Sequence, residues 1–159
     1  MDQVLSNCLK LVLRRYKKYG NKTFGLVGAA IVTDEFDTVY ETAMQTMSGK
    51  WKHAEHCVID KFHSLYGDLP DNAVLVTTLS PCFVHMDDRC GESCSKLISD
   101  AGIHDVYTGL DDTTQLNYDH DHYDDVSFNV IITDNKDIQY VCGLLLKKIS
   151  EVQTLSPNL

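Results

Sequence analysis

The sequence predicts a single α/β domain in which a five-stranded mixed sheet lies between two layers of helices, a three-layer α/β/α arrangement. Two observations support this prediction. Helical and strand patterns alternate along the chain in the order α-β-β-α-β-α-β-β-α. The 159 residues, 43% hydrophobic and 23% charged, also suffice for one domain with its own core. We expect this domain to span 1–159, with a motif-bearing core at about 24–149 and a tail at 150–159.

The first half of the chain predicts a helix, two strands and a second helix. Apolar residues recur at helical spacing from the start of the chain until Gly20, which can end the helix. The apolar run 24–33 is typical of a buried strand, and 38–46 alternates like a second strand. After the loop MSGKWK, a helix with one apolar face begins at His53 and stops near Gly67.

The second half of the chain predicts three strands and two helices. The apolar composition of 73–79 indicates a buried strand, and 104–109 and 126–133 read as two further strands. A helix spans about 91–101, and the last helix covers 137–150.

Charge and hydropathy restrict the class of protein. The net charge of −9 argues against undirected, counterion-driven binding to nucleic acid, although residues 1–24 are locally basic. Residues 111–125 contain six Asp and no Lys or Arg, and we expect both charged stretches to be solvated surface. The hydrophobic runs are too short to span a bilayer, and the start of the chain lacks the order of a signal peptide.

The six cysteines fall into two groups. Without a signal peptide, a reduced cytoplasmic chain is favoured over a disulfide framework. Three cysteines lie on apolar faces of predicted helices and are interpreted as small core residues: Cys8, Cys57 and Cys142. The other three crowd into thirteen residues beside Pro81 and need another explanation: Cys82, Cys90 and Cys94.

Three polar motifs lie at junctions between predicted elements. His53-Ala54-Glu55 opens a helix, Pro81-Cys82 follows a strand, and Cys94 lies in the first turn of the next helix. Parallel strands with connecting helices bring such ends to one edge of a sheet. One imidazole and two thiolates suit Zn²⁺, and three protein ligands leave a position for water, as in catalytic zinc sites. The sequence therefore predicts a catalytic Zn²⁺ site.

Glu55 follows the ligand His53 by two residues and is the predicted catalytic residue. Zinc lowers the pKa of bound water towards neutrality. A carboxylate that faces the open position can take the proton from this water and return it to a leaving nitrogen.

These residues resemble the signature of zinc deaminases, H-x-E followed by P-C-x-x-C. From about Phe24 to Ile149 the chain is similar to members of the cytidine deaminase superfamily. LVGAAIVTD and CSKLISDAGIHDVYTG are similar to segments of cytidylate and riboflavin-pathway deaminases. The resemblance implies a cytidine deaminase-like fold and hydrolysis of a soluble pyrimidine nucleotide or related aminopyrimidine, with a cytidylate-like substrate. Zinc-bound hydroxide would attack the amine-bearing ring carbon and release ammonia, and a homo-oligomer is also implied.

The spacing of the cysteines departs from that signature. Cys82 and Cys94 are separated by eleven residues instead of two. Riboflavin-pathway pyrimidine deaminases also lengthen this loop, so the resemblance holds. Cys94 is favoured as the third ligand because Cys-Ser-Lys-Leu-Ile matches the Cys-x-x-x-Ile pattern of the family, and Cys90 is the alternative.

The substrate is less well specified by the sequence. Many relatives place an Asn before the His-x-Glu helix to hold a sugar, and 44–52 contains none. Side chains flanking the predicted ligands offer positive charge and an aromatic face to a base or phosphate. The candidates for substrate binding are Lys50, Trp51, Lys52, His85 and Arg89.

Two other functions remain open at this point. A deaminase of bases in tRNA or single-stranded DNA would use the basic first helix beside its pocket. A non-catalytic, zinc-stabilised binding module would keep the ligands but would have no use for Glu55.

Overall fold

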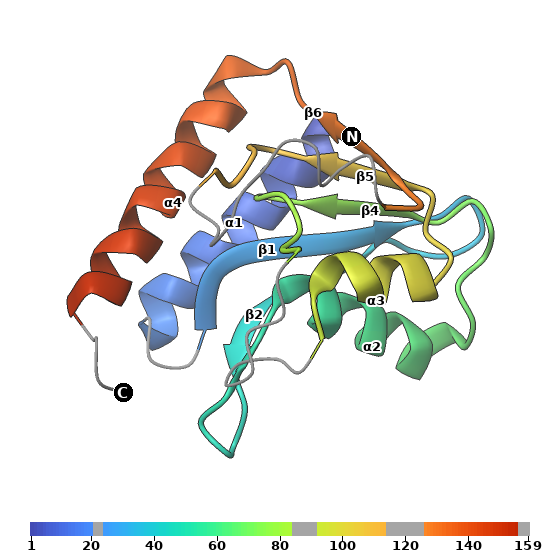
Figure 1. The fold of residues 1–159 in the computed structure, drawn as a ribbon, viewed down its shortest axis with the longest axis horizontal. Coiled ribbons are helices and arrows are strands. Elements are labelled where there is room, and N and C mark those ends of the chain that lie inside the picture. Colours follow the sequence, from blue (N-terminus) through green and yellow to red (C-terminus); the bar gives the residue numbers. More distant parts are fainter. Residues whose placement is uncertain (21–23, 84–91, 114–125, 156–159) are drawn as a thin grey trace.

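The computed structural model describes residues 1–20, 24–83, 92–113 and 126–155, and shows one mixed sheet covered by helices (Figure 1). The predicted three-layer α/β/α fold is confirmed. The elements are α1 (Asp2–Tyr19), β1 (Phe24–Val32), β2 (Val39–Gln45), β3 (Trp51–Lys52), α2 (Ala54–Tyr66), β4 (Val74–Thr77), α3 (Cys94–Asp100), β5 (Asp105–Thr108), β6 (Asn129–Ile132) and α4 (Lys136–Leu155).

The strand order in the sheet is β3-β2-β1-β4-β5-β6. β1 is antiparallel to both β2 and β4, whereas β4, β5 and β6 are parallel to one another. The five predicted strands are present, but the predicted count is one short because MSGKWK is not entirely a loop. Gly49 adopts φ 83°, which reverses the chain, and Trp51 and Lys52 then pair with Gln45 and Met44.

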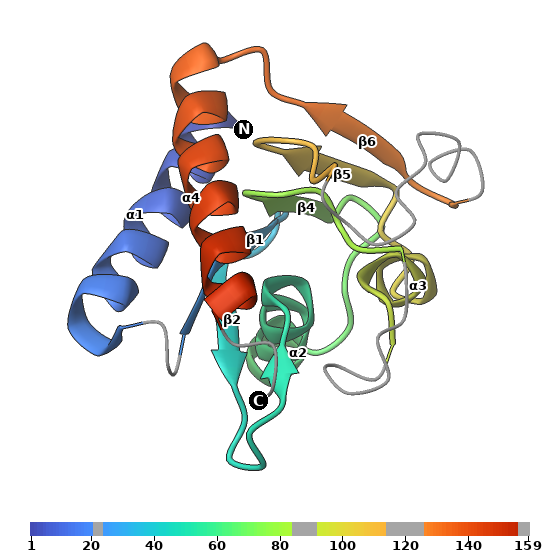
Figure 2. The same cartoon turned by 60° about the vertical axis from the view of Figure 1, so that its left-hand side comes forward.

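The helices cover the two faces of the sheet in pairs, α1 with α4 and α2 with α3 (Figure 2). Each pair encloses its own hydrophobic cluster. One cluster gathers Leu5, Cys8, Val12, Val76 and Cys142, and the other gathers Val58, Phe62, Leu75, Ile98 and Val106. Cys8, Cys57 and Cys142 are buried, which confirms their interpretation as core residues.

Two helix boundaries differ from the predicted ones. α3 begins at Cys94 instead of about residue 91, because the Ser93 hydroxyl caps it by accepting a hydrogen bond from the Lys96 amide at 3.2 Å. α4 continues to Leu155, into the predicted tail. Among the described helices, none combines the length and apolar character needed to cross a membrane.

Two glycines allow α1 and α4 to approach the sheet closely. A Cβ atom added at Gly28 would lie 2.8 Å from Val12 of α1, and one at Gly109 would lie 2.5 Å from the Cys142 sulfur of α4. The same Gly109 position is 2.9 Å from the carbonyl oxygen of Thr78. Gly109 follows β5 and Thr78 follows β4, so this close packing against α4 helps to fix the segments that come after these two strands.

Candidate metal centre

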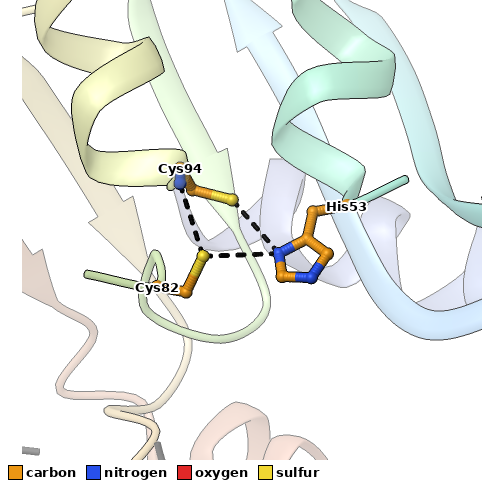
Figure 3. Close-up of side chains that lie close together, drawn as sticks. All are labelled: His53, Cys82 and Cys94. Atoms are coloured by element: carbon orange, nitrogen blue, oxygen red, sulfur yellow. Dashed lines mark hydrogen bonds between the residues drawn. The ribbon is translucent and has the colours of Figure 1, made fainter. Parts of the chain in front are cut away.

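The three predicted zinc ligands come together from three elements (Figure 3). His53 is the N-cap of α2, Cys82 lies in the segment after β4, and Cys94 is the first residue of α3. His53 Nδ1 lies 3.2 Å from Cys94 Sγ and 3.5 Å from Cys82 Sγ. The possible ligand atoms of the three side chains all lie within 4.8 Å of one another, and in the close-up the side chains face a common centre.

These separations fit one tetrahedral zinc ion. Zinc binds nitrogen at roughly 2.0–2.1 Å and sulfur at roughly 2.3 Å, which places such donors about 3.5 Å apart in a tetrahedron. The nitrogen–sulfur distances of 3.2 and 3.5 Å in the structure agree with that value. An imidazole with two thiolates is also a donor set that zinc prefers. The residues present therefore fit zinc, the cofactor expected from the sequence.

Cys82 is held in the form that binds metal. A hydrogen bond with the Cys94 side chain lowers the pKa of Cys82, burial opposes this, and His53 lowers the pKa further, to about 4. The Cys94 amide also donates to Cys82 Sγ at 3.3 Å. The thiolate is the metal ligand, so the local electrostatics prepare Cys82 for a cation.

Glu55 lies in the first turn of α2, directly beside the ligands, and only 3% of it is exposed. Burial raises the pKa of its carboxyl group, while the nearby His53 and a hydrogen bond with the Cys94 side chain act in the opposite direction. A raised pKa brings a carboxylic acid closer to the pH at which it can both accept and donate protons.

Hydrogen bonds behind Cys82 fix the segment that carries it. The Thr78 hydroxyl accepts from the Gly28 amide at 3.1 Å. The Ser80 hydroxyl donates to Asp111 at 2.9 Å and accepts from the Asp112 amide at 2.8 Å. The first two aspartates of the acidic stretch are thus half-buried structural residues, and the prediction of solvated surface is wrong for them. Residues 114–125 lie outside the described residues.

A second set of contacts fixes Cys94. The Ser95 amide donates to the Cys82 carbonyl at 3.1 Å. His56 of α2 is buried and its Nε2 lies 3.2 Å from the Glu92 carbonyl oxygen. Burial lowers the pKa of His56, so the neutral ring donates this bond. The sequence interpretation missed His56, although a position three residues after His53 on a helix indicates the same face.

The structure places only some of the candidate substrate-binding residues. Lys50 is exposed, and Trp51 and Lys52 form β3. Lys52 pairs with Asp60 of α2, and a Cβ atom added at Gly25 would lie 3.4 Å from the Trp51 ring. The remaining candidates, and the alternative ligand, lie outside the described residues: His85, Arg89 and Cys90.

Several solved structures share the fold. A tRNA:A34 deaminase, studied for A-to-I editing at the wobble position of transfer RNA, matches with a TM-score of 0.62 and 17% identity, over 91% of this chain and 99% of its own. The dCMP deaminase of cyanophage S-TIM5 gives 0.54 and 20% identity, over 84% of this chain and 99% of its own. At these identities the likeness shows the fold alone.

A third structure is longer than the region it shares with this chain. The diaminohydroxyphosphoribosylaminopyrimidine deaminase/5-amino-6-(5-phosphoribosylamino)uracil reductase of Thermotoga maritima gives a TM-score of 0.59 and 20% identity. The match covers 91% of this chain and 42% of that protein, so this chain spans less than half of it. No curated protein sequence matches the chain.

The family described as the cytidine and deoxycytidylate deaminase zinc-binding region matches residues 2–110. The matched region contains the three zinc ligand candidates and Glu55. Its members are hydrolytic deaminases that act on C–N bonds, so the reaction class and the zinc cofactor expected from the sequence are confirmed. Because the match covers more than two thirds of the 159 residues, the chain belongs to the cytidine and deoxycytidylate deaminase family.

Proposed function

We propose that this protein is a hydrolytic deaminase of a soluble pyrimidine nucleotide or related aminopyrimidine, with a cytidylate-like substrate. The observation that supports the proposal is the buried carboxyl group of Glu55 beside His53, Cys82 and Cys94. A structural zinc site has no use for such a carboxyl group, because burying it costs free energy that its hydrogen bonds only partly offset. A deaminase needs it to move a proton.

In the proposed reaction, water replaces the exocyclic amine of the pyrimidine and ammonia leaves. Zinc held by the three ligands supplies Lewis acidity, which brings the pKa of water at the site towards neutrality. A Glu55 carboxylate oxygen accepts a proton from the attacking water and returns it to the amine nitrogen as the C–N bond breaks. Burial of Glu55 keeps solvent from competing for that proton.

The substrate class is tested by measuring ammonia release from a panel. The panel contains cytidine, its mono- and triphosphates in ribo and deoxy forms, the riboflavin-pathway aminopyrimidine and a single-stranded oligonucleotide. We expect turnover of one soluble pyrimidine by the zinc-loaded protein and none after zinc is removed by a chelator. Zinc binding without ammonia release from any of these compounds would contradict the proposal and favour the non-catalytic module.

The assignment of the third ligand is tested by two matched variants. We propose His53, Cys82 and Cys94 as ligands, so Cys94→Ser should lose stoichiometric zinc while Cys90→Ser keeps it. Zinc content by elemental analysis and a circular dichroism spectrum of each variant separate ligand loss from misfolding. A full complement of zinc in Cys94→Ser would contradict the assignment of Cys94 as the third ligand.

A second candidate is a deaminase of bases in nucleic acid, favoured by one charged face. The exposed basic side chains of α1 are Lys10, Arg14, Lys17 and Lys18. Such a face binds phosphates with an affinity that falls steeply with salt. Binding of a single-stranded oligoribonucleotide that weakens with salt, and that Arg14→Glu with Lys18→Glu removes, would support this candidate. No binding at low salt would discard it.

We also propose that residues 1–159 form one domain and that copies of the chain associate. The proposal rests on the single sheet and on the family resemblance. Light scattering after size-exclusion chromatography gives the molar mass directly, and a mass of 17.9 kDa at assay concentration would contradict association.

A further inference from the structure

The eleven-residue spacing between the two proposed cysteine ligands raises the question of what fixes the position of the second one. With two residues between them, a short turn of main chain largely determines where the second cysteine lies. Here eleven residues separate Cys82 and Cys94, and a spacing of that length does not by itself determine where the second cysteine lies. Other contacts must therefore hold the start of α3 at the metal centre.

The contacts that hold the start of α3 come from two directions. From the segment after β4, Cys82 accepts bonds from the amides of Cys94 and Ser95, at 3.3 and 3.1 Å. These bonds involve a ligand at one end, so they form part of the centre itself. From α2, His56 Nε2 lies 3.2 Å from the carbonyl oxygen of Glu92, two residues before Cys94.

The remaining polar contacts of this segment are internal to it. Ser93 caps α3 through the Lys96 amide, and Lys96 forms ion pairs with Glu92 and Asp100. Such contacts stabilise the first turns of α3 but do not fix the helix relative to α2. Among the described side-chain hydrogen bonds, the one from His56 joins α2 to the segment that precedes Cys94 without using a ligand.

The position of His56 on α2 makes this contact effective. The start of α2 carries His53, Glu55 and His56. A hydrogen bond from His56 therefore positions the segment before Cys94 relative to the same helical turn that carries the proposed histidine ligand and the proposed proton carrier. The His56 side chain is buried, at 9% exposure, which shields the bond to Glu92 from water.

We propose that His56 is a positioning residue that fastens the Glu92–Cys94 segment to α2 and so keeps Cys94 within bonding distance of a zinc ion held by His53 and Cys82. The inference rests on the proposed zinc site. It concerns zinc affinity first, and turnover only as a consequence.

Three substitutions of His56 separate the hydrogen bond from packing. In His56→Gln the amide nitrogen reaches about as far as Nε2 and can still donate, whereas in His56→Asn it is too short. His56→Phe keeps a ring but has no donor. Loss of an outer contact of a metal site typically costs 10–100-fold in affinity, so we expect Asn and Phe to weaken zinc binding roughly tenfold. Gln should stay within about threefold of wild type.

Zinc dissociation constants are measured by competition with a chromophoric chelator, and Co²⁺ absorption reports whether both thiolates bind. His63→Phe is the matched control, because His63 lies on α2, is exposed and, among the described residues, forms its side-chain hydrogen bond with Gly67 at the end of its own helix. We expect it to keep wild-type affinity. Urea unfolding of each zinc-free variant measures stability separately.

The outcomes distinguish this inference from the proposed function. If the wild-type chain binds no zinc, the zinc site itself is wrong. If wild type binds zinc but Asn and Phe bind it equally tightly, or if Gln loses as much as Asn, the positioning role is overturned. Should Phe fail to fold, the Gln and Asn pair still decides, since the two differ by one methylene group.

Discussion

Two glutamates, Glu41 on β2 and Glu55 in the first turn of α2, show how the surroundings of a carboxyl group determine its charge state. Glu41 lies on β2 and pairs with Arg15 of α1 and Lys61 of α2. Burial raises its pKa, but the hydrogen bonds from the two cations outweigh burial and the pKa is lowered overall. Glu55 forms no ion pair with Lys or Arg among the described residues, and burial raises its pKa.

This difference is the basis on which we assign Glu41 to the stability of the fold and propose Glu55 for proton transfer. A carboxylate held between two cations is fixed in one charge state, which stabilises the fold and prevents proton transfer. A buried carboxyl group without a Lys or Arg partner costs stability in the zinc-free protein, and its charge state changes easily. The roles of the two carboxyl groups can therefore be compared by making the same substitution, Glu to Gln, at each position.

The largest expected difference between the two variants is in turnover. Glu55→Gln removes the proposed proton carrier, so kcat should fall roughly 10²–10⁴-fold while zinc is retained. Glu41→Gln should keep kcat within about threefold, because the interactions described for Glu41 run to Arg15, Lys61 and Thr42 and not to the proposed ligands. Ammonia release by both proteins, at matched zinc content, checks this. A Glu55→Gln protein with wild-type turnover would refute the proposed mechanism.

The next largest difference is in the free energy of unfolding, where the order reverses. Glu41→Gln leaves Arg15 and Lys61 without their shared carboxylate at a half-buried position, which should cost about 1–3 kcal/mol. Glu55→Gln removes a buried acid without a cation partner and should cost less than about 1 kcal/mol. Urea unfolding of the zinc-free proteins measures both. Equal losses in the two variants would contradict the contrast.

A smaller effect is expected in the pH dependence of stability. The folded-state pKa of Glu41 lies below its ordinary value of 4.5, so its contribution is fully present above that value. The contribution is lost as the pH falls through the lowered pKa. The stability difference between wild type and Glu41→Gln should therefore stay constant from about pH 7 to pH 5.5 and shrink below about pH 4.5. A difference that grows on acidification would be inconsistent with this sign.

The smallest effect is expected at an exposed ion pair used as a reference. Lys148 and Glu151 on α4 pair at 3.2 Å with about half of each side chain exposed. Lys148→Ala should change the free energy of unfolding by less than about 0.5 kcal/mol. The same urea assay measures it, and a loss as large as that of Glu41→Gln would show that exposure is not the deciding variable.

The sequence was sufficient for the fold class and for predicting that His53, Cys82 and Cys94 come together as a group that could hold zinc, because both depend on short patterns. Apolar runs and the alternating stretch 38–46 indicated the five predicted strands, and His53-Ala54-Glu55 and Pro81-Cys82 fell where helix starts and strand ends meet. The two-residue β3 was missed because a strand of that length has no period of its own.

Contacts between distant segments could not be predicted in the same way. Glu41 looked like one polar residue of an alternating strand, because its partners Arg15 and Lys61 lie on two helices that cover opposite faces of the sheet. His56 stood next to Glu55 in the sequence, but its partner is a main-chain oxygen, which no residue type can reveal.

The ion pairs of Glu41 also affect whether a strand from another molecule can pair with β2. Within β2, Met44 and Gln45 are the residues that pair with β3 in the described part of the chain. The part of β2 before Met44 therefore has no strand paired with its outer side among the described residues. Lys61 donates to the Tyr40 carbonyl at 3.1 Å, and the Glu41 carboxylate accepts from the Thr42 amide at 3.3 Å. An open strand of this kind is a template for aggregation. Side chains already bond the Tyr40 carbonyl and the Thr42 amide. A strand from another molecule could therefore pair there only by displacing Lys61 and Glu41, whose ion pairs connect α1, β2 and α2.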